Sequence, residues 1–243
     1  MPLSPALPSS PLPLLGRVVA WLGGAVFAAS LLYAAWWFTS VLAVPATDAP
    51  GAWTAIAWNV IVFSVFALHH SVMARTPAKR WLQRAVAPAL ERSVYVWVAS
   101  LLFIAVCMGW QRGPGVLYRV DGLAASLLTG VQLAGAVLTL GAARVLDGLE
   151  LAGIRQAQGR TGPSGIRVVW PFTWVRHPIY LGWVLMVFAA TPMTVDRLVF
   201  AVTSTAYLLI SMPWEERSLC AAAGPAYLAY CQRVRWRLVP GLY

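Results

Sequence analysis

Residues 18–44 read VVAWLGGAVFAASLLYAAWWFTSVLAV, an uninterrupted stretch without a charged side chain. The hydrocarbon core of a bilayer is about 30 Å thick and an α-helix rises about 1.5 Å per residue, so about 20 apolar residues are enough to cross it. This stretch is longer than that. It therefore predicts a helix that spans a membrane, and it sets the fold class of the chain.

Further apolar stretches follow along the chain. Three of them have about the length that a bilayer requires. The apolar stretch after Pro178 has only 13 residues, and Pro192 and the Asp196-Arg197 pair separate it from the next one. We expect these last two stretches to form a short helical hairpin. The predicted fold is all-α, a polytopic membrane helix bundle of five to six membrane helices. The additional stretches are Trp53–Ala74, Ser93–Trp110, Leu123–Ala143, Ile179–Thr191 and Val195–Met212.

The composition agrees with a membrane protein. The 243 residues are 60% hydrophobic and only 11% charged, whereas soluble globular chains are about 25% charged. We expect one membrane domain over residues 17–243, preceded by a disordered Pro-rich tail over residues 1–16. The three cysteines show no paired spacing, and no phosphate-binding loop is present, so neither a metal site nor phosphate-loop chemistry is predicted.

The basic residues indicate the orientation. Counted over alternating loops, 15 of the 18 Lys and Arg residues fall on one side of the membrane, and such an excess marks the cytoplasmic side. Both termini, the 75–92 loop and the 144–177 segment are therefore predicted to be cytoplasmic. The net charge of +10 is explained by this bias, because the basic residues are not gathered on one polar element as nucleic-acid binding would require.

Three polar clusters lie at the predicted cytoplasmic side. The first follows the second apolar stretch and contains His69, His70 and Arg75. Its imidazoles could relay a proton, bind haem or make hydrogen bonds at the membrane boundary.

The second cluster, Arg176-His177-Pro178-Ile179-Tyr180-Leu181-Gly182, predicts a helix start, because proline suits the first helical turn. Unpaired N–H groups there, together with Arg176, would bind a carboxylate or phosphate. Alternatively, Arg176 and His177 only reach the membrane surface from a helix end.

The third cluster follows the second arm of the hairpin and contains Pro213, Glu215, Glu216 and Arg217. Acidic residues in the first turn after a proline favour a helix start through the helix dipole. The functional interpretation is that one carboxylate binds an ammonium group, or the hydroxyls and amine of a nucleoside. The sequence alone favours neither interpretation.

Taken together, the second and third clusters resemble a known family. Residues 176–182, a short apolar hairpin, residues 215–219 and the Gly224-x-x-Tyr227-x-x-Tyr230 pattern are similar to the C-terminal half of the integral-membrane methyltransferases. These include isoprenylcysteine carboxyl methyltransferases and phospholipid N-methyltransferases. The upstream motifs resemble most the bacterial methanethiol S-methyltransferase branch, and they extend the resemblance to about 170 residues: 69–75, Glu91-Arg92-Ser93-x-Tyr95 and 150–156.

The resemblance implies S-adenosylmethionine as the methyl donor in a bacterial inner-membrane protein. The implied cofactor-binding residues fall on the second and third clusters. The chain departs from the family pattern at Cys220–Ala223, which is alanine-rich where relatives often carry larger residues. The resemblance therefore does not define the floor of the pocket at these positions. The implied cofactor residues are Arg176, His177, Tyr180, Gly182, Glu215 and Glu216.

Several methyl acceptors are compatible with these motifs. A thiol must lose a proton before it attacks, and His70 or His69 is then the best base, with Arg75 favouring the thiolate. A small apolar thiol that partitions into membrane lipid is the preferred substrate. An isoprenylcysteine carboxylate or a lipid amine is the alternative.

A non-enzymatic alternative is a haem, quinone or transport protein. Neighbouring residues on a helix point about 100° apart, so His69 and His70 are poorly placed to share one haem iron. Asp147 and Glu150 are the acids near the end of the fourth stretch, which is few for an ion path.

Overall fold

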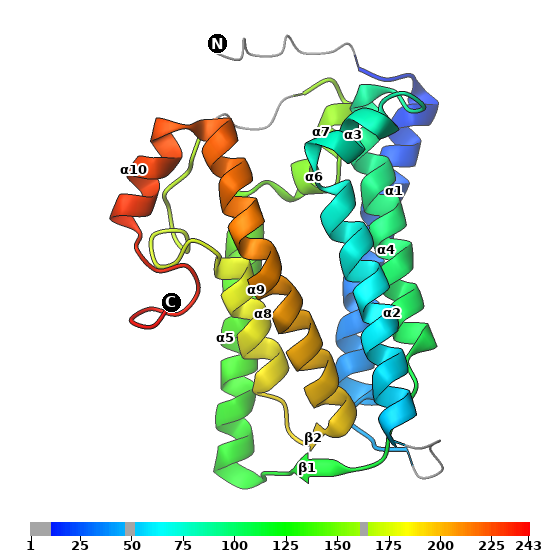
Figure 1. Ribbon diagram of the computed structural model, residues 1–243, viewed down its shortest axis with the longest axis vertical. Helices are drawn as coiled ribbons and strands as arrows, with labels where there is room; N and C mark the ends of the chain where they lie inside the picture. The colour runs from blue at the N-terminus through cyan, green and yellow to red at the C-terminus, as the bar shows by residue number, and fades with distance from the viewer. Residues whose placement is uncertain (1–10, 47–51, 161–164) are drawn as a thin grey trace. The chain divides into compact units, whose positions relative to one another are not determined.

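The computed structural model describes residues 11–46, 52–160 and 165–243. Almost all of their secondary structure is helical (Figure 1). Residues 1–10 of the predicted tail lie outside the described residues, and the first helix already begins at Leu14. Five helices are long and apolar enough to cross a membrane, which confirms an all-α polytopic protein: α1 (Leu14–Trp36, continued by η1, Trp37–Val41), α2 (Ala52–Met73), α4 (Glu91–Gly109), α5 (Gly122–Val145) and α9 (Val195–Ala223).

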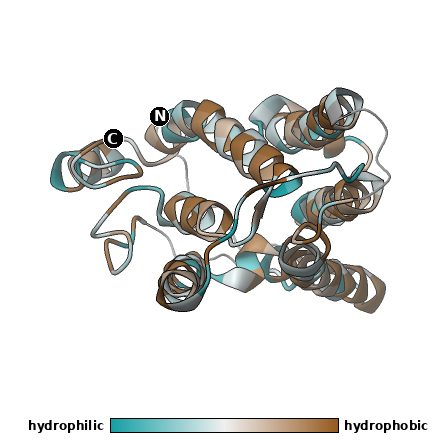
Figure 2. Ribbon diagram, turned by 90° about the horizontal axis from the view of Figure 1, so that it is seen from below, coloured by the Kyte–Doolittle hydropathy of each residue, from teal (hydrophilic) through white to brown (hydrophobic). Residues whose placement is uncertain are grey.

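The four long apolar stretches coincide with helices to within a few residues. Figure 2, which looks at the helices from one end, shows that hydrophobic residues predominate on them. The short stretch after Pro178 forms α8 (Pro178–Phe188). At about 1.5 Å per residue, its 11 residues span roughly 16 Å, which is too short to cross a bilayer. Only the second arm of the hairpin, α9, has that length.

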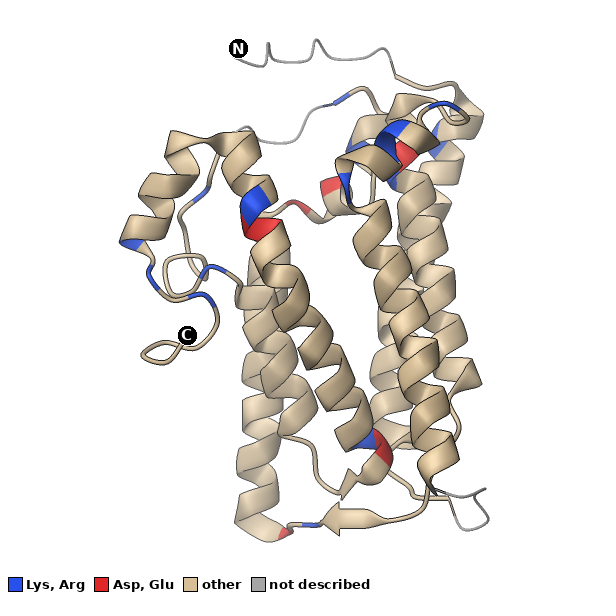
Figure 3. Ribbon diagram, viewed as in Figure 1, with Lys and Arg blue, Asp and Glu red and all other residues tan. Residues whose placement is uncertain are grey.

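Helix α9 is longer than the sequence predicts. It runs for 29 residues and continues through Pro213, whereas the predicted apolar stretch ends at Met212 and one interpretation of the acidic residues is a new helix start after the proline. A proline lacks an N–H group and removes one hydrogen bond of the ladder, but the helix persists on both sides. Glu215 and Glu216 consequently lie near one end of α9, and Asp196 and Arg197 at the other, with no charged residue between them (Figure 3).

The chain divides into two compact units, which are described separately. The first contains residues 1–35, 65–108 and 146–164. In it the Trp97 indole donates to the Val19 carbonyl (3.0 Å). Gly153 has a positive φ of 78°, and an added Cβ would lie 2.7 Å from the Ser93 nitrogen. Its short elements are α3 (Thr76–Leu82), η2 (Pro88–Leu90), α6 (Gly148–Leu151) and α7 (Ile154–Ala157).

The second unit contains residues 36–64, 109–145 and 165–243. Helices α5 and α8 approach closely, because an added Cβ at Gly182 would lie 2.5 Å from the Gly135 carbonyl oxygen. The Trp183 indole joins α8 to α9 by donating to the Ser204 hydroxyl (2.9 Å). Phe200 on α9 lies in an aromatic core with Trp37, Phe63 and Trp110. The remaining elements are β1 (Val116–Tyr118), which pairs antiparallel with β2 (Met193–Thr194), and α10 (Pro225–Arg233).

A buried pair of charged residues begins α9. The Arg197 guanidinium donates to the carbonyls of Phe38 (3.0 Å), Thr39 (2.9 Å) and Pro192 (2.6 Å). Asp196 accepts from the Gly113 amide at 2.9 Å. Buried charge is tolerated only when it is hydrogen-bonded in this way, so these residues connect α9 to the loops of its own unit.

Candidate functional site

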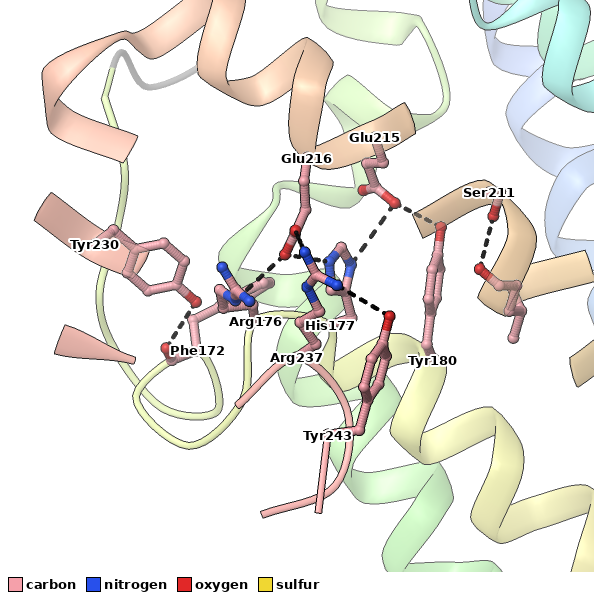
Figure 4. A network of polar contacts seen from close by, with 11 residues as sticks. Phe172, Arg176, His177, Tyr180, Ser211, Glu215, Glu216, Tyr230, Arg237 and Tyr243 are labelled. Carbon is pink, nitrogen blue, oxygen red and sulfur yellow. Dashed lines mark hydrogen bonds and ion pairs between the residues drawn. The ribbon is translucent and has the colours of Figure 1, made fainter. Parts of the chain in front are cut away.

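The second unit brings two of the predicted clusters together. His177 precedes α8, and Tyr180 lies in its first turn, while the two glutamates come from the far end of α9. Figure 4 shows the side chains of these residues converging, with Arg176 and Arg237 beside them. The unit thus gathers Arg176, His177, Tyr180, Glu215, Glu216 and Arg237.

Glu216 is the more enclosed of the two glutamates. Its Oε1 lies 3.3 Å from both Arg176 Nε and His177 Nε2. Its Oε2 lies 3.0 Å from Arg237 Nη2. Only 10% of the side chain is exposed. A buried carboxylate is stable only when its charge is compensated, and two guanidinium groups supply the counter-charge here.

Glu215 is placed differently. Its Oε2 accepts a hydrogen bond from the Tyr180 hydroxyl (2.5 Å), and His177 Nδ1 lies 3.7 Å away. The side chain is 46% exposed. Because a carboxylate can accept several hydrogen bonds, Glu215 retains capacity to accept from an ammonium or hydroxyl group of a ligand.

His177 lies between the two carboxylates and is buried. Its ring stacks on Tyr180, with centroids 5.1 Å apart. Burial lowers the pKa of His177 below its ordinary value of 6.5, although Glu215 and Glu216 oppose that shift, and this favours the neutral imidazole. A neutral imidazole has one N–H group, and the shorter distance is the one from Nε2 to Glu216.

The two backbone amides directly before α8 are hydrogen-bonded to the last part of the chain, which the sequence does not predict. The Arg176 amide donates to the Trp236 carbonyl and the His177 amide to the Arg237 carbonyl, both at 2.9 Å. These two N–H groups are therefore occupied by the last part of the chain, and the expectation that unpaired N–H groups at the helix start bind an anion stays a prediction for the first turn of α8. Any anion would instead meet the side chain of Arg176 or the first turn of α8 itself.

Gly182 and Arg237 are the other differences at this site. Gly182 faces Gly135 and Thr139 of α5, where a side chain would not fit. Close helix packing therefore explains the glycine, and its assignment to cofactor binding stays a prediction. Arg237 enters the sequence interpretation only as one of several basic residues near the chain end. Nothing in its spacing from Glu216 reveals the contact, since it depends on how residues 234–243 fold back.

The predicted catalytic residues lie in the first unit. The Tyr95 hydroxyl is 2.9 Å from His70 Nδ1, and the Phe66 ring centroid is 5.6 Å from the His70 ring. His69 Nδ1 is buried and has no hydrogen-bond partner within the described part of the chain. Arg75 precedes the first turn of α3. The catalytic roles of His69, His70 and Arg75 stay predictions.

Comparison with known proteins places the chain in a family. It is 37% identical over 229 residues to methanethiol S-methyltransferase 2 of Bradyrhizobium diazoefficiens, covering 90% of this chain and 87% of that protein. It is 36% identical over 186 residues to methanethiol S-methyltransferase of Mycobacterium tuberculosis, covering 74% and 76%. Rat nurim is 26% identical over 178 residues, covering 68% of each chain. No family model and no solved structure matches the chain.

The helices and these relatives define the protein class as a multi-pass membrane enzyme that transfers methyl groups. The chain belongs to the family of membrane methyltransferases that contains the methanethiol S-methyltransferases.

Proposed function

We propose that this enzyme transfers a methyl group from S-adenosylmethionine to a small apolar thiol at the cytoplasmic face of a bacterial inner membrane. The observation that carries the proposal is the convergence of His177 and Tyr180, at the start of α8, with the two glutamates of α9, which are 35 or more residues further along the chain. The names of the bacterial relatives support a thiol acceptor and a bacterial membrane.

The residues of the site fit a donor that carries charges of both signs. Glu215 is exposed enough to accept from the donor's amine or ribose hydroxyls. The Arg176 guanidinium, 12% exposed, is the cation closest to α8 in sequence and suits the donor's carboxylate. Glu216 holds the guanidiniums in place. When bound, S-adenosylmethionine would supply the electrophilic methyl group for an in-line displacement.

The protein's contribution is mainly orientation. Holding the two reactants in line in a dry site lowers the barrier by about 7–11 kcal/mol in favourable intramolecular models. A thiol has a pKa of about 8.5 or above, so it also needs a proton acceptor. We assign that role to His70, with His69 and Arg75 assisting, because the Tyr95 hydroxyl contacts the His70 ring and can fix its orientation.

The cytoplasmic orientation of this end of the chain rests on the basic residues: 15 of the 18 fall on one side when the α8–α9 hairpin is counted as leaving that side and returning to it. Charged donors are synthesised in the cytoplasm, so the site must open there. The cluster of residues 215–217 lies at one end of α9, outside its uncharged middle part, as a site at the membrane surface requires.

Methyl transfer from labelled S-adenosylmethionine tests the proposal. The purified full chain in detergent is offered methanethiol, longer alkanethiols, a farnesylcysteine analogue and phosphatidylethanolamine in parallel. Label in the alkylated thiols alone is expected. Label in the farnesylcysteine carboxyl or the lipid amine would replace the thiol by that acceptor, and no transfer together with no binding of S-adenosylhomocysteine would reject the donor.

The base is tested separately. His70→Ala is expected to lower thiol turnover, and a higher pH should restore it, because a thiolate formed in solution bypasses the base. Unchanged turnover of His70→Ala at pH 7 would reject the base role without affecting the cofactor site.

A further inference from the structure

A segment that the sequence motifs do not include, residues 234–243, is bound to the loop that carries Arg176 and His177. Its Trp236 and Arg237 carbonyls accept from the amides of Arg176 and His177 at 2.9 Å. Upstream of it, the Tyr230 hydroxyl on α10 donates to the Phe172 carbonyl (2.9 Å). The loop is therefore attached at two points to the last part of the chain.

The Arg237 side chain is itself held on several sides. Its Nη2 lies 3.0 Å from Glu216 Oε2, and its Nη1 donates to the Tyr243 hydroxyl at 3.0 Å. The guanidinium also lies over the Tyr243 ring, 5.5 Å from the centroid. The main-chain oxygen of Tyr243 accepts from three successive amides, those of residues 237–239. These contacts leave the guanidinium few alternative positions.

The charges around Glu216 determine what the loss of Arg237 would change at the site. Among the described residues, two guanidinium groups form ion pairs with the Glu216 carboxylate, those of Arg176 and Arg237. Without Arg237, Glu216 Oε2 would lose its charged partner, and the Glu216 carboxylate would attract the Arg176 guanidinium more strongly. The side chain of Arg176 would then be less available to an anionic group, and the carboxylate pair would carry excess negative charge.

We propose that Arg237 is a positioning residue for the methyl donor, acting through Glu216 to hold Arg176 and His177 in their binding arrangement, with Tyr243 fixing Arg237. This inference rests on the proposed donor site. Arg237 contacts no reacting atom in this role. Its loss should therefore weaken donor binding and leave the rate at saturating donor nearly unchanged.

Four variants of the full chain in detergent test the role: Arg237→Ala, Arg237→Lys, Tyr243→Phe and Arg235→Ala. Arg235 is the matched control, because it is an exposed arginine two residues earlier that makes no ion pair within the described residues. The readouts are the Kd for S-adenosylhomocysteine, and the KM for the donor and kcat with methanethiol.

Arg237→Ala is expected to raise the Kd and the donor KM by about tenfold, which is the effect of losing one charge-assisted hydrogen bond, with kcat within about threefold. Arg237→Lys should recover part of the affinity, because lysine restores the positive charge beside Glu216 but not the hydrogen bond from the guanidinium to the Tyr243 hydroxyl. Tyr243→Phe should raise the Kd by about twofold, and Arg235→Ala should match wild type.

A Kd within twofold of wild type for folded Arg237→Ala would overturn the inference. So would a loss of kcat at unchanged KM, since that pattern belongs to a catalytic group. If Arg237→Ala does not fold, an unchanged Kd in both Arg237→Lys and Tyr243→Phe has the same meaning. Failure of the proposed function is distinguishable, because wild type would then neither bind S-adenosylhomocysteine nor methylate any acceptor.

Discussion

The two ends of helix α9 each carry charged residues, but the surroundings of those residues differ. At the start of the helix, Asp196 and Arg197 are 2% and 4% exposed and are bonded mostly to main-chain groups of η1 and of neighbouring loops. Near the other end, Glu216 is enclosed by side-chain cations, while Glu215 beside it is 46% exposed. One helix thus holds both a fully enclosed and a partly open charged cluster.

The difference shows how burial separates structural charge from charge that can serve a ligand. A buried guanidinium whose three nitrogens each donate to a main-chain carbonyl has little left to offer a ligand, and removing it leaves those carbonyls unsatisfied. A carboxylate with one hydroxyl donor and an exposed face can still accept hydrogen bonds. The start of α9 should therefore matter for stability, and its far end for donor binding.

The largest effect is expected from Arg197→Met, which removes the partner of three carbonyls. The free energy of unfolding should fall by about 4 kcal/mol, because each buried acceptor left unpaired costs about 1–3 kcal/mol. The Kd for S-adenosylhomocysteine of the folded protein should stay within about twofold. Thermal denaturation in detergent and ligand titration measure the two quantities. A tenfold loss of affinity would show that the two ends are not independent.

Glu216→Gln should affect both quantities. The amide leaves Arg176 and Arg237 without a counter-charge, which costs about 3 kcal/mol of stability for a buried ion pair that has lost one partner. It should also abolish stabilisation by S-adenosylhomocysteine in a thermal shift experiment, because the guanidiniums lose their fixed positions. Full retention of ligand stabilisation would show that Glu216 does not organise the site.

Glu215→Gln separates binding from stability. Tyr180 can still donate to the amide oxygen, so the free energy of unfolding should change by less than about 1 kcal/mol. The Kd for S-adenosylhomocysteine should rise by about tenfold, because the charge facing the ligand amine is lost. Asp121→Asn, an exposed acid-to-amide change in the loop before α5, is the control and should leave both unchanged. Equal affinity in the two variants would assign the ligand amine elsewhere.

The sequence predicts the long helices well, because the length of an uncharged stretch is a direct consequence of bilayer thickness. It also predicts that residues 176–180 and 215–216 belong together, by resemblance. It does not predict that α9 continues through Pro213, since a local propensity for a helix start is outweighed by packing on both sides. Arg237 is missed for another reason: its contact with Glu216 is set by the path of the whole 234–243 segment.

The smallest expected effect is a pH dependence of the free energy of unfolding, which should arise at the glutamate end of α9 and not at its start. Burial lowers the pKa of His177 below its ordinary value of 6.5, so the unfolded chain binds a proton at this position more readily than the folded chain. The contribution of neutral His177 to the free energy of unfolding is complete above about pH 6.5. It is lost as the pH falls toward the pKa of the folded protein, by at most about 1.4 kcal/mol per pH unit.

The unfolding free energy of wild type should consequently fall more steeply between pH 7 and pH 5.5 than that of His177→Gln. Arg197→Met, which keeps His177, should retain the wild-type slope, because an arginine does not titrate in this range. Thermal denaturation of the three proteins over a pH series measures the slopes. A shallower slope in wild type than in His177→Gln would mean that the two glutamates outweigh burial and that His177 is charged, in which case the open end of α9 would present an imidazolium to its ligand.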